Sequence, residues 1–183
     1  AVGAVDAVLR IVLTRGGRRI ALIEALPRPL DAYRVGTIRY APARVLDGLK
    51  TLSYGANMLA KRLAQEQGHD EALLVTPHGR VLEGARQAFI CSLDGDTLVT
   101  PPLSDHILDS ITRRRVLETG LVTERSISVD ELPFATEAFL AVTTVEVHPV
   151  HAIDGVSLSP APGPLTTAVA ERVRAAIAAA VAP

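Results

Sequence analysis

The chain has 183 residues, a formal net charge of −1 and a hydrophobic fraction of 48%. These values predict one medium-sized folded domain with a substantial core and exclude a disordered chain, and a single cysteine excludes a disulfide-stapled one. Near-zero net charge and 3% aromatic residues argue against a nucleic-acid surface, which needs a basic field and stacking side chains. No apolar run is long enough for a membrane span, and the first residues lack a signal-peptide pattern. We therefore expect a cytoplasmic protein whose partners are small molecules or a second copy of itself.

The basic residues are unevenly divided, because seventeen of the nineteen are arginine and the two lysines are Lys50 and Lys61. A lysine can lose its proton and attack a carbonyl, whereas an arginine stays charged. Lys61 falls on the polar face of a predicted helix, where a solvated charge is the preferred interpretation. Lys50 lies before that helix, on a strand or loop, and is the better candidate for chemistry. A bias in genome composition is the alternative explanation for the scarcity of lysine.

The first third of the chain is rich in predicted strands. β-Branched residues at 8–14 end at a turn over 15–17, a second strand covers 20–26, and a third covers 33–40. The period then changes, because apolar residues recur at helical spacing from Ala56 to Gln67. Gly68 follows as a stop signal, so this segment is predicted to be an amphipathic helix.

The remaining two thirds alternate short strands with turns. Strands are expected at 71–75, 81–82, 88–93 and 98–99, arranged as an antiparallel meander, with Cys91 buried among them. A helix over 110–119 begins at Ser110, which is a favoured N-cap residue. Two further strands are expected near 122–129 and 138–147, and a final helix starts at Pro164, directly after Gly163. The predicted class is α+β with mainly antiparallel sheets.

Glu83 is an anomaly in this pattern, because a carboxylate follows two apolar residues where a strand should enter the core. A carboxylate that is buried needs a cationic partner. The spacing leaves three interpretations open: a solvated charge at a strand end, a salt bridge to Arg80 or Arg86, or a functional carboxylate.

A second group of polar residues lies at the start of the helix predicted over 110–119. Ser110, Ile111 and Thr112 would present free backbone N–H groups and hydroxyls, which together make an anion site. Thr143 and Thr144 add hydroxyls within an apolar strand pattern, although threonine also favours strands by its shape alone.

The five histidines show no metal-binding pattern. His148 and His151 are three residues apart on an expected strand, so their side chains point to opposite faces and make a poor ligand pair. We expect no metal site.

Five spaced motifs run through residues 47–120, at 49–54, 70–74, 79–84, 98–103 and 107–113, and weaker ones follow at 137–139, 143–150, 153–155 and 162–166. In order and spacing they resemble the class IV aminotransferases, which are pyridoxal 5′-phosphate (PLP) enzymes of fold type IV. That family includes branched-chain aminotransferases, D-amino-acid aminotransferases and aminodeoxychorismate lyases. The resemblance extends from about Arg10 to the final helix.

The resemblance implies roles for two of the residues already singled out. Lys50 matches the lysine whose amine forms a Schiff base with the cofactor and later moves a proton between Cα and C4′. Glu83 matches the acid that pairs with the pyridinium nitrogen and keeps the ring electron-withdrawing. Leu108 matches the apolar residue that packs against the ring. Tyr54 stands at a position that varies among subfamilies, where a phenol can reach the cofactor O3′, and its role stays open.

Other positions match the phosphate-binding residues of the family. These are Ile111 and Thr112, with Ser110 beside them at the helix start, and the hydroxyl of Thr143. The chain departs from the family pattern after Glu83, where a serine- or glycine-rich stretch with an asparagine is usual. Arg86 in that stretch either contacts a substrate carboxylate or the cofactor phosphate, or faces solvent, and Thr144 is a further substrate-binding candidate.

The family also has a smaller N-terminal lobe that the sequence does not represent. By resemblance, residues 1–183 would form one C-terminal-type PLP domain, a pseudo-barrel of mainly antiparallel sheets with flanking helices. About residues 1–30 would be the region between the lobes.

The activity implied is PLP-dependent transfer of an amino group from an amino acid to a 2-keto acid, of branched-chain or D-amino-acid type, by ping-pong chemistry. One alternative is an aminodeoxychorismate lyase, which yields 4-aminobenzoate and pyruvate. Another is a non-catalytic ligand-binding or dimerisation module, although the presence of both Lys50 and Glu83 argues against it. A homodimer is expected from the resemblance alone.

Overall fold

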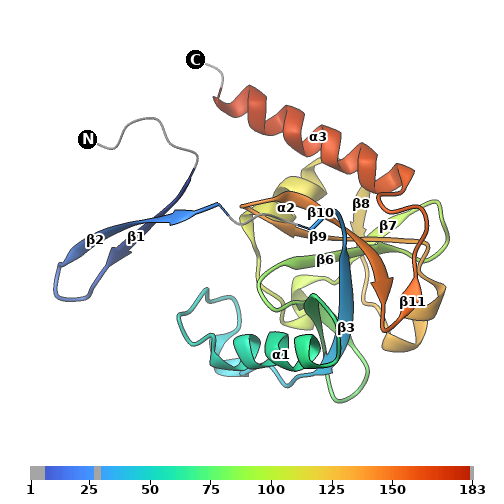
Figure 1. Ribbon diagram of the computed structural model, residues 1–183, viewed down its shortest axis with the longest axis horizontal. Helices are drawn as coiled ribbons and strands as arrows, with labels where there is room; N and C mark the ends of the chain where they lie inside the picture. Colours follow the sequence, from blue (N-terminus) through green and yellow to red (C-terminus); the bar gives the residue numbers. More distant parts are fainter. Residues whose placement is uncertain (1–6, 27–29, 182–183) are drawn as a thin grey trace. The chain divides into compact units, whose positions relative to one another are not determined.

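The computed structural model describes residues 7–26 and 30–181, and the chain divides into two compact units between Leu30 and Asp31. The first unit is an antiparallel hairpin of two strands, β1 (Ala7–Leu13) and β2 (Arg19–Ala25) (Figure 1). Both strands agree with the prediction from β-branched residues that flank a glycine turn.

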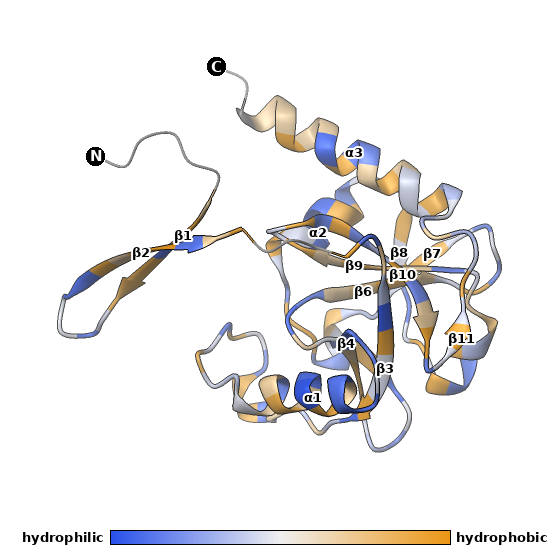
Figure 2. Cartoon of the chain, viewed as in Figure 1, coloured by the Kyte–Doolittle hydropathy of each residue, from blue (hydrophilic) through white to orange (hydrophobic). Residues whose placement is uncertain are grey.

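Both strands contain hydrophobic residues (Figure 2). Several of their apolar side chains are exposed, among them Leu9, Ile11 and Leu13. Arg10 and Glu24 form a bidentate ion pair across the two strands, in which Arg10 Nε lies 2.7 Å from Glu24 Oε1. A two-stranded hairpin gains little stability by itself in water, so the ion pair adds only weakly to its order.

The second unit contains a mixed sheet with the strand order β5-β4-β3-β10-β9-β6-β7-β8, and β11 pairs with β10. Its strands are β3 (Tyr33–Arg39), β4 (Glu71–Val75), β5 (Val81–Gly84), β6 (Ala88–Ser92), β7 (Leu98–Thr100), β8 (Val122–Glu124), β9 (Glu137–Val142), β10 (Glu146–Ile153) and β11 (Val156–Ser157). The helices are α1 (Gly55–Glu66), α2 (Ile111–Glu118) and α3 (Pro164–Val181), with short 3₁₀ turns η1 (Arg44–Leu46), η2 (Leu103–Asp105) and η3 (Val129–Phe134). The predicted α+β class with mainly antiparallel pairing is confirmed.

Four features of the sheet differ from the prediction. The strands β3–β4, β3–β10 and β7–β8 pair in parallel, and β6 pairs with β9 instead of continuing a meander from β5. The strand expected over 122–129 ends at Glu124, and the one expected over 138–147 is two strands joined by a turn at 143–145. A period of two identifies a strand and its buried face, but it does not identify the neighbouring strand.

Side chains that alternate along the strands form one hydrophobic cluster on each face of the curled sheet. Along β9, Ala138 and Leu140 join the cluster on its inner face, whereas Phe139 and Ala141 pack toward α2 and α3. The helix α1 covers β3, β4 and β5 through Ala60, which lies in a third cluster. Full burial of a large apolar side chain such as Phe139 stabilises a fold by about 2 kcal/mol.

The start of α3 is fixed by a buried carboxylate. Glu137 accepts hydrogen bonds from the backbone N–H groups of Leu165 (3.1 Å) and Thr166 (2.9 Å), which are unsatisfied within the helix. Gly163 leaves the space that the Glu137 carboxylate occupies, because a Cβ there would collide with it. Within residues 7–26 and 30–181, none of the helices has both the length and the apolar content needed to cross a bilayer.

Candidate active site

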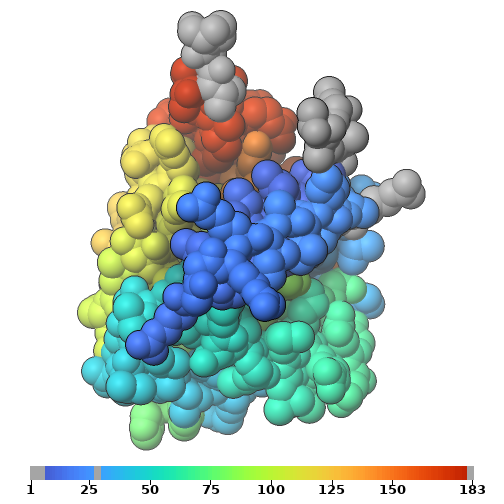
Figure 3. All heavy atoms as spheres, turned by 90° about the vertical axis from the view of Figure 1, so that its left-hand side faces the viewer, coloured from blue at the N-terminus to red at the C-terminus, as the bar shows by residue number. Residues whose placement is uncertain are grey.

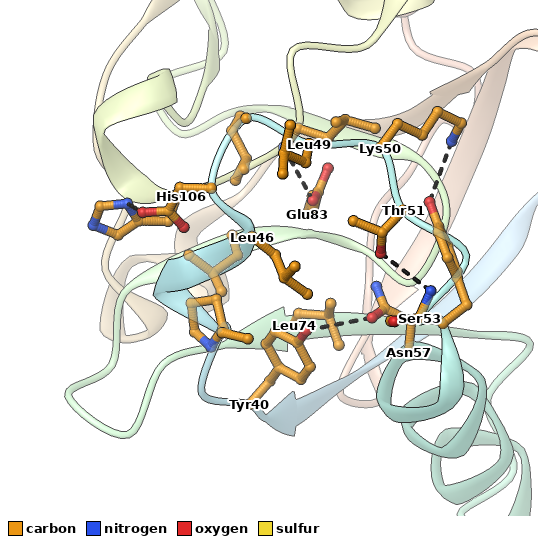
Figure 4. A pocket seen from close by; sticks show the side chains of 18 residues that line it. Tyr40, Leu46, Leu49, Lys50, Thr51, Ser53, Asn57, Leu74, Glu83 and His106 are labelled. Carbon is orange, nitrogen blue, oxygen red and sulfur yellow. Dashed lines mark hydrogen bonds and ion pairs between the residues drawn. The ribbon is translucent and has the colours of Figure 1, made fainter. Parts of the chain in front are cut away.

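One pocket gathers several of the residues that the sequence singled out. The loop between β3 and α1 forms one wall, β4 and β5 form another, and residues 106–108 close a third (Figure 4). Lys50, Tyr54, Glu83 and Leu108 all line it. Sequence motifs far apart in the chain are therefore brought to one place by the pairing of β3, β4 and β5.

Glu83 projects from β5 into this pocket, and its side chain is partly buried. Burial raises its pKa from 4.5 to about 7, although the Leu108 N–H and the positive charges of Lys50 and Arg113 oppose that rise. The N–H of Leu108 donates to Glu83 Oε1 at 3.2 Å. Among the described residues no cation forms an ion pair with Glu83, since Arg80 pairs with Asp105 instead.

This geometry decides between the interpretations of Glu83. A salt bridge to Arg80 or Arg86 was one expectation, and it is wrong, because the Arg86 side chain is exposed and Arg80 is engaged elsewhere. A solvated strand-end charge does not fit a carboxylate whose pKa is raised by burial. What remains is a partly buried acid without an ion-pair partner among the described residues, which can receive a positively charged group.

Lys50 lies on the opposite wall of the pocket, in the loop before α1. Its amine donates a hydrogen bond to the Tyr54 hydroxyl at 3.2 Å and lies 5.4 Å from the centre of that ring. Tyr54 precedes the first residue of α1 as its N-cap, so the helix start fixes the position of the phenol. The Lys50 side chain is exposed and has no carboxylate partner among the described residues, so its amine is accessible to a reactant.

Lys61 differs from the prediction of a solvated charge. Its Nζ lies 2.9 Å from Oε2 of Glu71, whose side chain is fully buried, and only 26% of the Lys61 side chain is exposed. Gln87 donates to the same carboxylate oxygen. The helical pattern assigned Lys61 to a polar face correctly, but it gave no sign that a carboxylate of β4 lies beneath that face. The two lysines thus have different surroundings, because Lys61 forms an ion pair within the fold and Lys50 lines the pocket.

The predicted phosphate-binding residues form a separate group beside the pocket, which they do not line. The hydroxyls of Thr112, in the first turn of α2, and Thr143 lie 3.3 Å apart. Thr143 was expected within a strand, but it occupies the turn between β9 and β10, which exposes its side chain. The Ser110 hydroxyl accepts from the Arg113 N–H and caps α2 as predicted, while Ile111 is exposed.

The two substrate-binding candidates are not brought into the pocket. Arg86 and Thr144 are both exposed and neither lines it. Their proposed contacts with a substrate find no further support in the geometry.

Sequence reasoning missed three residues that line the same pocket. Asn57 donates to the carbonyl oxygen of Ala85 at 2.9 Å and accepts from the Tyr40 hydroxyl at 3.3 Å, so it fixes the chain just after Glu83. His106 contacts Asp47 across the pocket rim (Figure 4). The helical pattern shows Asn57 only as a polar position, and nothing in the sequence marks His106 and Asp47 as neighbours.

Comparison with known proteins identifies the family. The amino-transferase class IV family model matches residues 1–153. A putative branched-chain-amino-acid aminotransferase from Methanocaldococcus jannaschii is 35% identical over 173 residues, covering 82% of this chain and 60% of the relative. A D-alanine aminotransferase from Bacillus licheniformis is 40% identical over 124 residues, covering 64% of this chain and 43% of the relative.

Solved structures agree with this result. The PLP-bound form of a hypothetical aminotransferase from Mycobacterium tuberculosis superposes with a TM-score of 0.80 at 27% identity, covering 94% of this chain and 68% of that one. The chain spans about half the length of the curated relatives it matches. The fold, the pocket and the family match over 1–153 agree, and the chain belongs to the class IV aminotransferase family.

Proposed function

We propose that this chain supplies the cofactor-binding domain of a PLP-dependent transaminase, which moves an amino group from an amino acid to a 2-keto acid. The observation that carries the proposal is that Lys50 and Glu83 line one pocket, where Glu83 is partly buried and has no ion-pair partner among the described residues. A primary amine and an unpaired buried acid in one pocket suit a ligand that has both a carbonyl and a basic ring nitrogen.

The available donors fit PLP. Lys50 offers an amine for the aldehyde carbon, Glu83 a carboxylate for the ring nitrogen, and Leu108 an apolar surface for the ring. Thr112 and Thr143 offer two adjacent hydroxyls for the phosphate, together with the N–H groups at the start of α2. When bound, PLP withdraws electrons from the substrate Cα and so stabilises the negative charge that develops there.

Three residues of this chain would then have separate roles in proton transfer. The Lys50 amine would hold the cofactor between turnovers and, once displaced by the substrate, would take a proton from Cα and return it. The Tyr54 hydroxyl, 3.2 Å from this amine, would orient it. Glu83 would hold a proton on the ring nitrogen, and that positive charge would lower the raised pKa of Glu83 in return.

The substrate class and the assembly are further parts of the proposal. A branched-chain amino acid or a D-amino acid as donor is supported by the names of the two relatives above. We also propose that residues 31–183 form the larger domain of the enzyme, that about residues 1–30 connect it to a smaller lobe, and that the protein is a cytoplasmic homodimer. Light scattering after size-exclusion chromatography measures the assembly directly.

The proposal is tested by adding PLP to the purified protein, reducing with borohydride and mapping the pyridoxyl adduct by peptide mass. An adduct on Lys50, absent in Lys50→Ala, is the expected result. Lys61 is the internal control, because it is the other lysine and is ion-paired to Glu71. An adduct on Lys61, or no adduct, would contradict the proposal. Amino transfer from L-leucine and from D-alanine to 2-oxoglutarate then separates the two substrate types.

A further inference from the structure

The segment that carries Lys50, residues 41–53, is weakly attached to the rest of the fold. Its regular structure is the single 3₁₀ turn η1, and its backbone hydrogen bonds, such as Leu49 N–H to Leu46 O (3.0 Å), stay within the segment or reach the adjacent Tyr54. Most of its apolar side chains are exposed, Leu52 by 99%, and Leu46 is half-buried without joining a core cluster. The segment lies on the molecular surface, coloured cyan in Figure 3. Neither backbone pairing nor core packing therefore fixes the position of the Lys50 side chain.

One polar contact attaches this segment to a distant part of the chain. His106 Nδ1 lies 2.8 Å from Asp47 Oδ2, and the same oxygen accepts from Arg44 Nε at 3.0 Å. Arg44 belongs to the segment itself, so its bond to Asp47 orients the carboxylate without anchoring it. Within residues 7–26 and 30–181, the Asp47–His106 contact is the only hydrogen bond or ion pair from 41–53 to a residue beyond Tyr54.

His106, the partner of Asp47, is held firmly by its surroundings. His106 has φ 66°, a left-handed conformation that non-glycine residues rarely adopt and that only a well-determined surrounding structure maintains. The residue before it, Asp105, pairs with Arg80 at 3.0 Å. The N–H of Leu108 donates to Glu83. The His106 ring is thus held in place by the same short loop that contacts the buried acid of the pocket.

We propose that the Asp47–His106 contact is a latch that holds the Lys50 segment against the pocket wall formed by Glu83 and Leu108. His106 is then a positioning residue for Lys50, and it acts through Asp47. This inference rests on the proposed function. In that function one PLP molecule contacts both Lys50 and Glu83, so the latch would keep the Lys50 amine at a suitable distance from Glu83.

The latch is tested first without cofactor, by hydrogen exchange at the amides of residues 44–50 in the purified protein. His106→Gly removes the ring while glycine keeps the left-handed backbone without strain. Asp47→Ala removes the other partner. Because a half-exposed pair contributes little, each variant is expected to speed exchange there by about threefold to fivefold. The double variant is expected to exchange no faster than Asp47→Ala alone, since that variant already removes the contact with His106 together with the bond from Arg44.

The second measurement is the dissociation constant of PLP, followed by its absorbance, with the yield of the borohydride adduct on Lys50. If the competent position of Lys50 becomes less populated, the dissociation constant rises by about the same factor as exchange does. Glu118→Ala is the matched control, because it removes a carboxylate from an exposed ion pair with Arg115 that lies away from the pocket. This control is expected to leave both measurements unchanged.

The outcomes separate the two proposals. Unchanged exchange at 44–50 in His106→Gly and Asp47→Ala would overturn the latch. Faster exchange with an unchanged PLP dissociation constant would show a tether that does not position Lys50, and would overturn the positioning role. If the unaltered protein forms no adduct on Lys50, the proposed function itself fails, and the positioning role fails with it before any variant is compared.

Discussion

Replacing Glu83 with glutamine is expected to stabilise the cofactor-free protein at alkaline pH and to weaken its binding of PLP. The structure removes most water from this carboxylate, and its contacts with the Leu108 N–H and with the more distant charges of Lys50 and Arg113 do not fully compensate for that loss. An amide of nearly the same size removes the charge but keeps an oxygen that can accept from Leu108. Glu83, which the proposed function needs for cofactor binding, is thus expected to lower the stability of the cofactor-free protein.

The magnitude follows from the pKa. Burial raises the pKa of Glu83 from 4.5 to about 7. At about 1.4 kcal/mol per pKa unit, this difference sets an upper limit of about 3 kcal/mol. Partial contact of the side chain with solvent reduces the expected value to about 1–2 kcal/mol. Because the folded state holds the proton of Glu83 more tightly, the contribution of Glu83 to stability falls as the pH rises from 4.5 to 7 and levels off above that range.

The assay is urea unfolding of the cofactor-free protein at several pH values across this range. The free energies of unfolding of Glu83→Gln and the unaltered protein are expected to agree at the acid end and to separate by about 1–2 kcal/mol at the alkaline end, with the variant more stable. Glu118→Gln, an exposed glutamate, controls for the loss of a charge. Curves that stay parallel over this range, or that separate with the variant less stable at the alkaline end, would refute the reasoning, and the contribution of His148, whose pKa burial lowers, is the same in both proteins.

Two further comparisons use the same unfolding assay. Lys61→Met leaves the fully buried Glu71 carboxylate without its cation and is expected to destabilise the fold by about 3 kcal/mol, whereas Lys50→Met, at an exposed lysine, is expected to leave the midpoint unchanged. Equal midpoints for the two lysine variants would contradict this assignment. Gly163→Ala is expected to cost about 1–3 kcal/mol, because its methyl group would displace the Glu137 carboxylate from the start of α3. Unchanged stability of Gly163→Ala would show that Glu137 can move without loss.

Local elements of this fold could be predicted from the sequence because their signals are local. Ser110 caps α2 as its type and position indicate. Gly68, directly after the C-cap of α1, has φ 88°, which is the left-handed conformation that commonly ends a helix. The pairing of β6 with β9, and the three parallel pairs, depend on which strands meet after the chain has turned back several times. Alternation of apolar residues carries no information on that choice.

The site, like the fold, could be predicted from the sequence only in part. Spaced motifs identified Lys50, Glu83 and Leu108, and the structure brings all three to one pocket. The ion pair of Lys61 escaped prediction because a helix pattern describes the helix and not the strand beneath it. The contact of Asp47 with His106 escaped because it depends on the path of two irregular loops.

The scarcity of lysine has a practical consequence for anyone who handles this protein. Apart from the α-amino group, amine-directed reagents such as activated esters, aldehyde fixatives and amine-coupling supports can react with only two side chains. One of these, Lys61, is shielded by its carboxylate partner, so Lys50 would take most of the modification. Attachment through an engineered surface cysteine is a better choice, because the native thiol, Cys91, is buried and its pKa is raised to about 12.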